Sequence, residues 1–191
     1  MVISRRCYFG LLLLLVAERL YELWLSRRNA RRAFSRGGVE IGHGQYNAIV
    51  AFHVLFLVAC AAEATFRSPQ IPSSVTLIAL IGEAGAQVFR YWSIASLGER
   101  WNTRVIAIPG EPPVTAGPYN YVRHPNYTAV VLEIACMPLI RGLWITAATF
   151  SAVNAILLTS RIRLEEGALG NSYKATFGAR PRFIPAVRSY G

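Results

Sequence analysis

A group of polar residues around position 160 has the types and spacing needed to bind and activate a ligand. Positions i, i+4, i+7 and i+11 of a helix share one face, and here they are Asn154, Leu158, Arg161 and Glu165. Glu166 projects to an adjoining face. A surface salt bridge could explain Arg161 and Glu165, but this order of the two charges contributes only a few tenths of a kcal/mol. A cation beside carboxylates suits a charged ligand better, and we therefore predict a ligand site here.

The segment from Gly117 to Tyr127 holds a second group of candidate residues. Pro125 disfavours a helical His124 and fits the first position of a helix, so His124 should lie at a helix entrance. The free N–H groups and positive dipole at such an entrance can hold an anion such as a carboxylate. The tyrosine rings of this segment could contact a flat ring or a sulfonium cation. The same pattern would equally suit an aromatic anchor at a membrane interface, so both interpretations stay open.

The composition indicates that a membrane positions these residues. Of the 191 residues, 53% are hydrophobic and 16% are charged, whereas roughly a quarter of the residues in a soluble domain are charged. The net charge is +10, and the basic residues lie between long apolar runs rather than along one polar face. We therefore predict an integral membrane protein with basic cytoplasmic loops that does not bind nucleic acid. The cysteines and histidines lack the spacing of a metal site, so no metal is expected.

Four apolar stretches have at least the length of about 17 to 25 residues that a helix needs to cross a bilayer. The last is too long for one crossing and is interrupted at Arg141-Gly142, which predicts a helical hairpin. The sequence thus predicts an all-α, polytopic integral membrane protein with five transmembrane helices, at about 8–25, 46–64, 73–95, 127–140 and 143–160. Residues 1–191 would form one membrane domain. Its 1–95 part holds three helices and a basic loop, and its 96–191 part holds the loop with the candidate ligand residues Gly117 to Tyr127, the hairpin and a C-terminal tail.

The distribution of arginines predicts the orientation of the helices. The connection after the first helix is rich in arginine, the next one carries Arg67 alone, and the tail beyond residue 160 is basic again. By the positive-inside rule, the N-terminus faces outward and the C-terminus lies in the cytoplasm.

Ionisable residues inside the predicted crossings are costly in lipid, and they normally face a polar interior. Glu83, Gln87 and Arg90 form one polar stripe on the third crossing, and Glu18, Arg19 and Glu22 form a similar cluster on the first. His53, Glu63 and Glu133 stand more isolated in the sequence. These residues could pair neighbouring helices, or they could line a buried ligand chamber.

The motifs in the second half of the chain resemble those of the isoprenylcysteine carboxyl methyltransferase family of integral membrane enzymes. The resemblance covers roughly residues 75 to 187, and the motifs occur in the same order. The matching pieces are Gly117-Pro118-Tyr119, Arg123-His124-Pro125-Asn126-Tyr127, Arg161-Ile162-Arg163-Leu164-Glu165-Glu166, and the tail from Tyr173 through Arg182-Phe183-Ile184-Pro185.

This resemblance implies a methyltransferase that uses S-adenosylmethionine, releases S-adenosylhomocysteine and encloses the cofactor between the cytoplasmic helix ends and the tail. It implies a lipophilic or lipidated acceptor that enters from the bilayer, with membrane lipids as the other partners. Carried over by motif, the predicted cofactor-binding residues are Tyr119, Arg123, His124, Pro125, Tyr127 and Glu166. Arg161 and Glu165 are the predicted catalytic residues facing the acceptor, and we place Asn154 with them as a substrate-binding residue on the shared helix face.

The short chain is similar to bacterial members of the family, which implies the bacterial inner (plasma) membrane. Its Glu18-Arg19-Leu20-Tyr21-Glu22-Leu23 and Arg27-Arg28-Asn29 pieces also resemble a branch associated with type III polyketide synthases. In the predicted reaction a methyl group passes in line to a carboxylate, phenol or enol oxygen, with Glu165 as the base and Arg161 orienting the acceptor. The alternatives are a membrane reductase that uses a nicotinamide cofactor and a non-catalytic membrane subunit.

Overall fold

The computed structural model describes residues 3 to 183 and consists mainly of helices. The five α-helices are α1 (Arg5–Ser35), α2 (His43–Phe66), α3 (Ser73–Leu97), α4 (Pro125–Leu139) and α5 (Trp144–Phe177). Two 3₁₀ helices, η1 (Gly98–Arg100) and η2 (Gly117–Asn120), lie between α3 and α4. The strands β1 (Val39–Ile41) and β2 (Val105–Ala107) pair antiparallel, with Glu40 opposite Ile106. The predicted all-α class is confirmed, and the short ribbon is an addition that the sequence did not predict.

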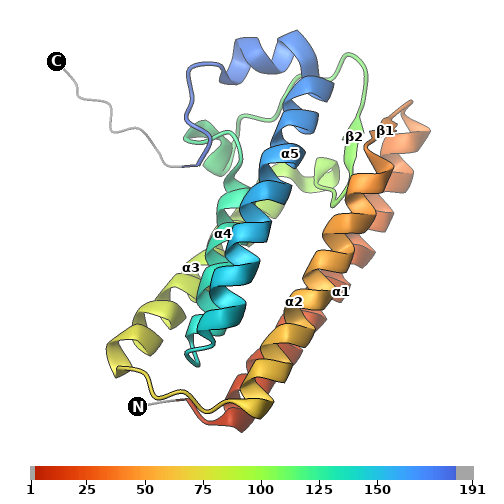
Figure 1. Cartoon of the computed structure of the whole chain (residues 1–191). Helices are drawn as coiled ribbons and strands as arrows, with labels where there is room; N and C mark the ends of the chain where they lie inside the picture. Colours follow the sequence, from red (N-terminus) through yellow and green to blue (C-terminus); the bar gives the residue numbers. More distant parts are fainter. Residues whose placement is uncertain (1–2, 184–191) are drawn as a thin grey trace, which may run out of the picture.

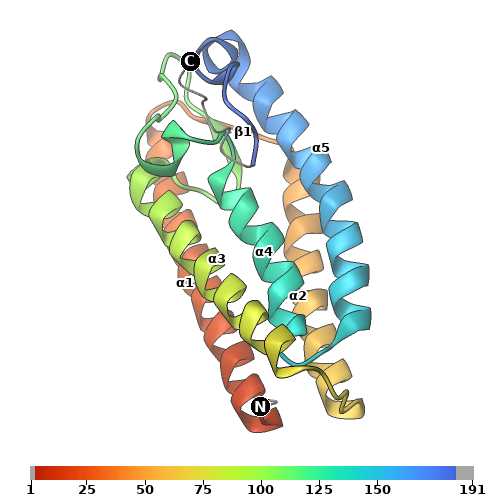
Figure 2. The same cartoon turned by 90° about the vertical axis from the view of Figure 1, so that its left-hand side faces the viewer.

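The helices run alternately up and down, with α3 packed against α4 and α4 against α5 (Figures 1 and 2). The core between them is apolar and includes Tyr8, Phe56, Ile134 and Met137. The β-ribbon, the segment between α3 and α4 and the last turns of α5 gather at one end of the bundle, opposite the start of α1 (Figure 1). Segments that are far apart in the sequence can therefore build one site at this end, which we call the loop end.

Two helices extend well beyond the predicted crossings. Of the arginines predicted to lie in a basic loop after residue 25, all but Arg36 belong to α1, which continues to Ser35. Arginine is a good helix former, and the first glycine pair follows only at Gly37-Gly38, where Gly37 adopts a φ of 81°. The last crossing, predicted to end at residue 160, continues as α5 to Phe177 with a break at Gly170. These helices continue past the predicted crossings because hydropathy indicates the part of a helix that suits a membrane, whereas helix ends follow local backbone preferences.

Two helices are long and apolar enough to cross a membrane, namely α2 and the Trp144–Gly170 part of α5. The other three helices of the described residues do not meet this criterion. Of these, α4 has only 15 residues, and ionisable side chains interrupt α1 and α3. The predicted number of five spans is therefore corrected to two candidate spans, because α4 is too short and the ionisable residues of α1 and α3 lower the hydropathy of these helices.

Charged residues of α1, α3 and α4 meet inside the bundle around Glu133, which stands isolated in the sequence. Its Oε2 accepts hydrogen bonds from Arg90 Nη2 at 2.8 Å, Gln87 Nε2 at 3.0 Å and Arg19 Nη2 at 3.3 Å. Glu22 lies 2.8 Å from Arg19. The polar residues of these helices are thus paired between helices, which offsets part of the cost of burying their charges.

Candidate active site

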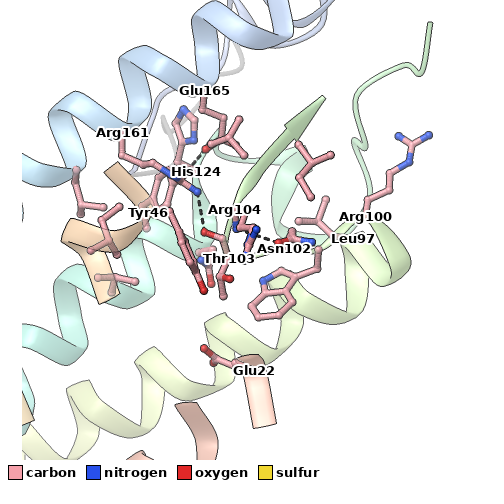
Figure 3. A pocket seen from close by; sticks show the side chains of 18 of the residues that line it. Glu22, Tyr46, Leu97, Arg100, Asn102, Thr103, Arg104, His124, Arg161 and Glu165 are labelled. Carbon is pink, nitrogen blue, oxygen red and sulfur yellow. Dashed lines mark hydrogen bonds between the residues drawn. The ribbon is translucent and has the colours of Figure 1, made fainter. Parts of the chain in front are cut away.

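A cavity of about 390 Å³ opens at the loop end of the bundle (Figure 3). Residues of α2, α5, the 99–114 segment and the start of α4 line most of it, and α1 and α3 contribute a few more side chains. About half of the lining side chains are apolar, and the others include arginines, glutamates and tyrosines, so the cavity offers both apolar surface and charged groups.

Arg161, Tyr127 and Glu165 form one hydrogen-bonded unit in the cavity wall. Arg161 Nε donates to the Tyr127 hydroxyl at 3.3 Å, and this hydroxyl donates to Glu165 Oε2. Arg161 Nη2 donates to the carbonyl of Thr103 at 2.8 Å (Figure 3). The Arg161 side chain is buried, yet its Nη1 has no hydrogen-bond partner among residues 3 to 183. A buried guanidinium with an unused donor is suited to hold an oxygen atom of a ligand.

The segment that carries Thr103 is attached to α1 by two side chains that the sequence analysis missed. Asn29 Nδ2 donates to the Trp101 carbonyl at 2.8 Å, and Ser26 Oγ accepts from the Thr103 N–H at 3.1 Å. Ser26 and Asn29 lie at i+4 and i+7 from Glu22, on one buried face of α1. The helical spacing of these polar residues could have predicted that they share a face. It was missed because residues after 25 were predicted to form a loop rather than a helix.

His124 occupies the N-cap position of α4 and Pro125 the first helical position, as the local sequence predicted. His124 Nε2 lies 3.1 Å from Glu166 Oε1 and 3.3 Å from the Tyr173 hydroxyl. Its ring also stacks on the ring of Tyr127, with centroids 5.3 Å apart. His124 therefore connects the Arg161 unit to the last turns of α5.

The C-terminal part of the described chain covers the entrance of α4. The N–H groups of Arg123 and His124 donate to the carbonyls of Pro181 and Arg182. These two N–H groups are therefore already hydrogen-bonded, and neither is free to bind an anion at the predicted site. The sequence could not show this, because residues 181 and 182 lie almost 60 positions later.

The side chains of the same region reinforce this attachment. The Arg123 guanidinium donates to the carbonyls of Gly178 and Arg180. Glu166 accepts from Arg182 Nη2 at 2.8 Å, and this contact is the main reason why the pKa of Arg182 is raised. The Ile184-Pro185 end of the family motif lies outside the described residues.

Aromatic side chains form the wall on the α5 side of His124. Tyr119, Tyr173 and Phe177 are buried together, and the rings of Tyr173 and Phe177 lie 4.8 Å apart. Burial raises the pKa of both tyrosines, with a further contribution from the negative charge of Glu165, so both phenols stay protonated. Asn126 lines the same cavity, and its Oδ1 is buried and accepts no hydrogen bond from the described residues.

The structure brings most of the predicted site residues into one place. Seven of them line the cavity, namely Tyr119, Arg123, His124, Tyr127, Asn154, Arg161 and Glu165. The other two, Pro125 and Glu166, are not part of its lining. Glu166 instead lies behind His124 and holds it in place.

Comparison with known proteins agrees with the motifs. Residues 77–171 match the isoprenylcysteine carboxyl methyltransferase family. "Uncharacterized protein YpbQ" of Bacillus subtilis (strain 168) is 38% identical over 162 residues, which cover 85% of this chain and 96% of that protein. An "Uncharacterized protein" of Haemophilus influenzae is 26% identical over 161 residues, which cover 83% and 92%.

Proposed function

The chain belongs to the isoprenylcysteine carboxyl methyltransferase family, and on this premise we propose that it methylates an oxygen atom of a lipophilic acceptor at the membrane, with S-adenosylmethionine as the methyl donor. The family implies a membrane methyltransferase, whereas a nicotinamide-dependent reductase or a non-catalytic subunit gains no support from it. One observation carries the proposal. A single cavity joins an aromatic pocket around His124 to the Arg161, Tyr127 and Glu165 unit.

The residues around His124 fit this cofactor. Tyr119, Tyr173 and Phe177 provide apolar ring surfaces for an adenine base, and the unpaired Oδ1 of Asn126 can accept a hydrogen bond from an amino group. Glu166 and Tyr173 fix the orientation of the His124 ring. When bound, S-adenosylmethionine supplies an electrophilic methyl group on a sulfonium cation.

The Arg161 unit fits the acceptor. We propose that Arg161 Nη1 binds the acceptor oxygen and stabilises its negative charge, while Glu165 takes its proton. The Tyr127 hydroxyl lies between the two and holds both in place. The apolar side chains of the lining lower the local polarity around the reacting oxygen, which strengthens these electrostatic interactions. Asn154 lies on the same face of α5 and lines the same cavity.

The helices beside the cavity support entry of the acceptor from the bilayer. The two candidate spans, α2 and α5, both line the cavity, with Val50 and Leu57 from α2 and Leu157 from α5. In this proposal a lipid chain passes between these two candidate spans. Arginine-rich α1 ends at the loop end, so we propose that this end and the C-terminus face the cytoplasm of a bacterial cell, at the plasma membrane.

Of the three oxygen acceptors that the sequence leaves open, the geometry favours a phenol or an enol. An ionised carboxylate needs no base and would be repelled by Glu165, whereas a phenol or an enol must lose a proton. A bacterial polyketide lipid such as an alkylresorcinol or an alkylpyrone has this chemistry, as the resemblance to the polyketide-associated branch suggests.

The decisive experiment uses the purified protein in detergent with S-adenosylmethionine that carries an isotope label in its methyl group. It is incubated with a lipid extract of the source organism, and the lipid that gains the label is identified by mass spectrometry. Stabilisation of the protein by S-adenosylhomocysteine but not by NADPH is expected. Stabilisation by NADPH alone would support the reductase, and no labelled lipid together with no stabilisation by either ligand would support the non-catalytic subunit.

A further inference from the structure

The cavity extends beyond the proposed reaction site to a second polar group, formed by Glu22 of α1, His53 of α2 and Arg90 of α3 together with Arg19. We call this group the cavity floor. In Figure 3, Glu22 lies across the cavity from Arg161 and Glu165. The Glu22 and Arg90 side chains are 5% and 2% exposed, so water contributes little to their solvation. Groups buried to this degree normally have their hydrogen bonds satisfied.

Glu22 and His53 each have an unused hydrogen-bond acceptor. Glu22 Oε2 pairs with Arg19 Nη1 at 2.8 Å, but Oε1 accepts no hydrogen bond from the described part of the chain. Its nearest cation is Arg90 Nη1, at 3.8 Å. His53 Nδ1 lies 2.9 Å from the carbonyl of Ile49. A carbonyl can only accept, so Nδ1 carries the proton and Nε2 of the neutral ring has a free lone pair.

The charges of the floor indicate a neutral ligand. The guanidinium groups of Arg19 and Arg90 are already matched by the carboxylates of Glu22 and Glu133. An anionic ligand would add an unbalanced charge in a buried place and would face the Glu22 carboxylate. A hydroxyl group is neutral, can donate to Glu22 Oε1 or His53 Nε2, and can accept from a guanidinium.

We propose that the cavity floor is a subsite for a second hydroxyl group of the acceptor, separate from the oxygen that is methylated. This proposal rests on the proposed function, and it makes Glu22 a specificity-determining residue. The acceptor would then be a lipid whose polar end bears at least two oxygens, one held by Arg161 and the other by Glu22. Methylation of this second oxygen removes its hydrogen-bond donor, so a molecule methylated there no longer fits the floor.

The test compares two probes that differ by one hydroxyl group, 5-pentadecylresorcinol and 3-pentadecylphenol, whose single hydroxyl cannot occupy both the Arg161 site and the floor. Their affinities are measured on the full chain in detergent, saturated with S-adenosylhomocysteine. The resorcinol should bind at least about tenfold more tightly, because a hydrogen bond to a buried charged group contributes that much. The variants E22L and H53F should each reduce this preference.

A matched control is E83L. Glu83 joins the same charged network through Gln87, at 2.8 Å, but does not line the cavity. This variant should lose a half-buried carboxylate without losing the preference for the resorcinol. Equal binding of the two probes by the unmodified protein, or binding of neither, would overturn the subsite, and this comparison needs no variant that might misfold. Binding of S-adenosylhomocysteine is measured first, since its absence would contradict the proposed function rather than the subsite alone.

Discussion

Replacement of Glu165 by glutamine tests the proposed chemistry most directly. The glutamine carbonyl can still accept the hydrogen bond from the Tyr127 hydroxyl, so Tyr127 and Arg161 should keep their positions. Glutamine cannot take a proton from the acceptor, and general-base catalysis typically contributes about 100-fold or more to the rate. E165Q should therefore lower turnover by about 100-fold, which corresponds to about 2.7 kcal/mol in the activation free energy.

Two measurements separate loss of the base from loss of structure. The dissociation constant of S-adenosylhomocysteine, determined by calorimetry, should stay unchanged in E165Q, whereas single-turnover transfer of the labelled methyl group should fall. The deficit should also shrink as the pH rises towards about 10, the ordinary pKa of a phenol, because the acceptor then ionises without a base. A suitable control is E111Q, which alters a carboxylate that lines the cavity but pairs with Arg36 and Arg100. Unchanged turnover in E165Q, or a deficit that is the same at every pH, would refute the assignment.

Three further substitutions examine the parts of the site. H124A should weaken binding of S-adenosylhomocysteine, because it removes the ring held between Glu166 and Tyr173; an unaltered dissociation constant would exclude His124 from the cofactor site. S26A should lower turnover more than cofactor affinity, since it loosens the segment whose Thr103 carbonyl holds Arg161, and hydrogen exchange should increase at residues 101–104. Normal exchange there would show that Ser26 is dispensable for this attachment. E133A leaves Arg90 buried beside only the more distant Glu22, and it should lower the free energy of unfolding by about 3 to 5 kcal/mol. A thermal midpoint equal to that of the unmodified protein would contradict this account of the bundle.

The sequence predicted those features of the fold and site that depend on local preferences. Pro125 defines the start of α4 and the N-cap position of His124, because its ring restricts the residue before it. The spacing of Arg161 and Glu165 placed both on one face of α5, and both line the cavity. These predictions need only the geometry of one helix.

Features that depend on contacts between distant segments could not be predicted in this way. Nothing in the spacing along the chain indicates that Thr103 accepts a hydrogen bond from Arg161, or that Tyr127 lies between Arg161 and Glu165. The tail that covers the entrance of α4 is a similar case, because its carbonyls replace a ligand that the isolated helix end would attract. In each case the partner is a backbone carbonyl or a hydroxyl. Because every residue type has a backbone carbonyl, the residue types in the sequence do not reveal which carbonyl is used.

The error in the number of membrane spans and the proposed second subsite have one physical origin. Ionisable residues on α1 and α3 lower the hydropathy of these helices, and the same residues meet Glu133 of α4 in a buried, paired cluster. Because each arginine faces a carboxylate, the cluster can remain charged away from water, and it holds three helices in a fixed relation. A rigid floor of this kind can discriminate between ligands that differ by one hydroxyl group, since an unmatched group there cannot be solvated by water. The charges that make these helices poor candidates for spans are thus the ones that would give the cavity its selectivity.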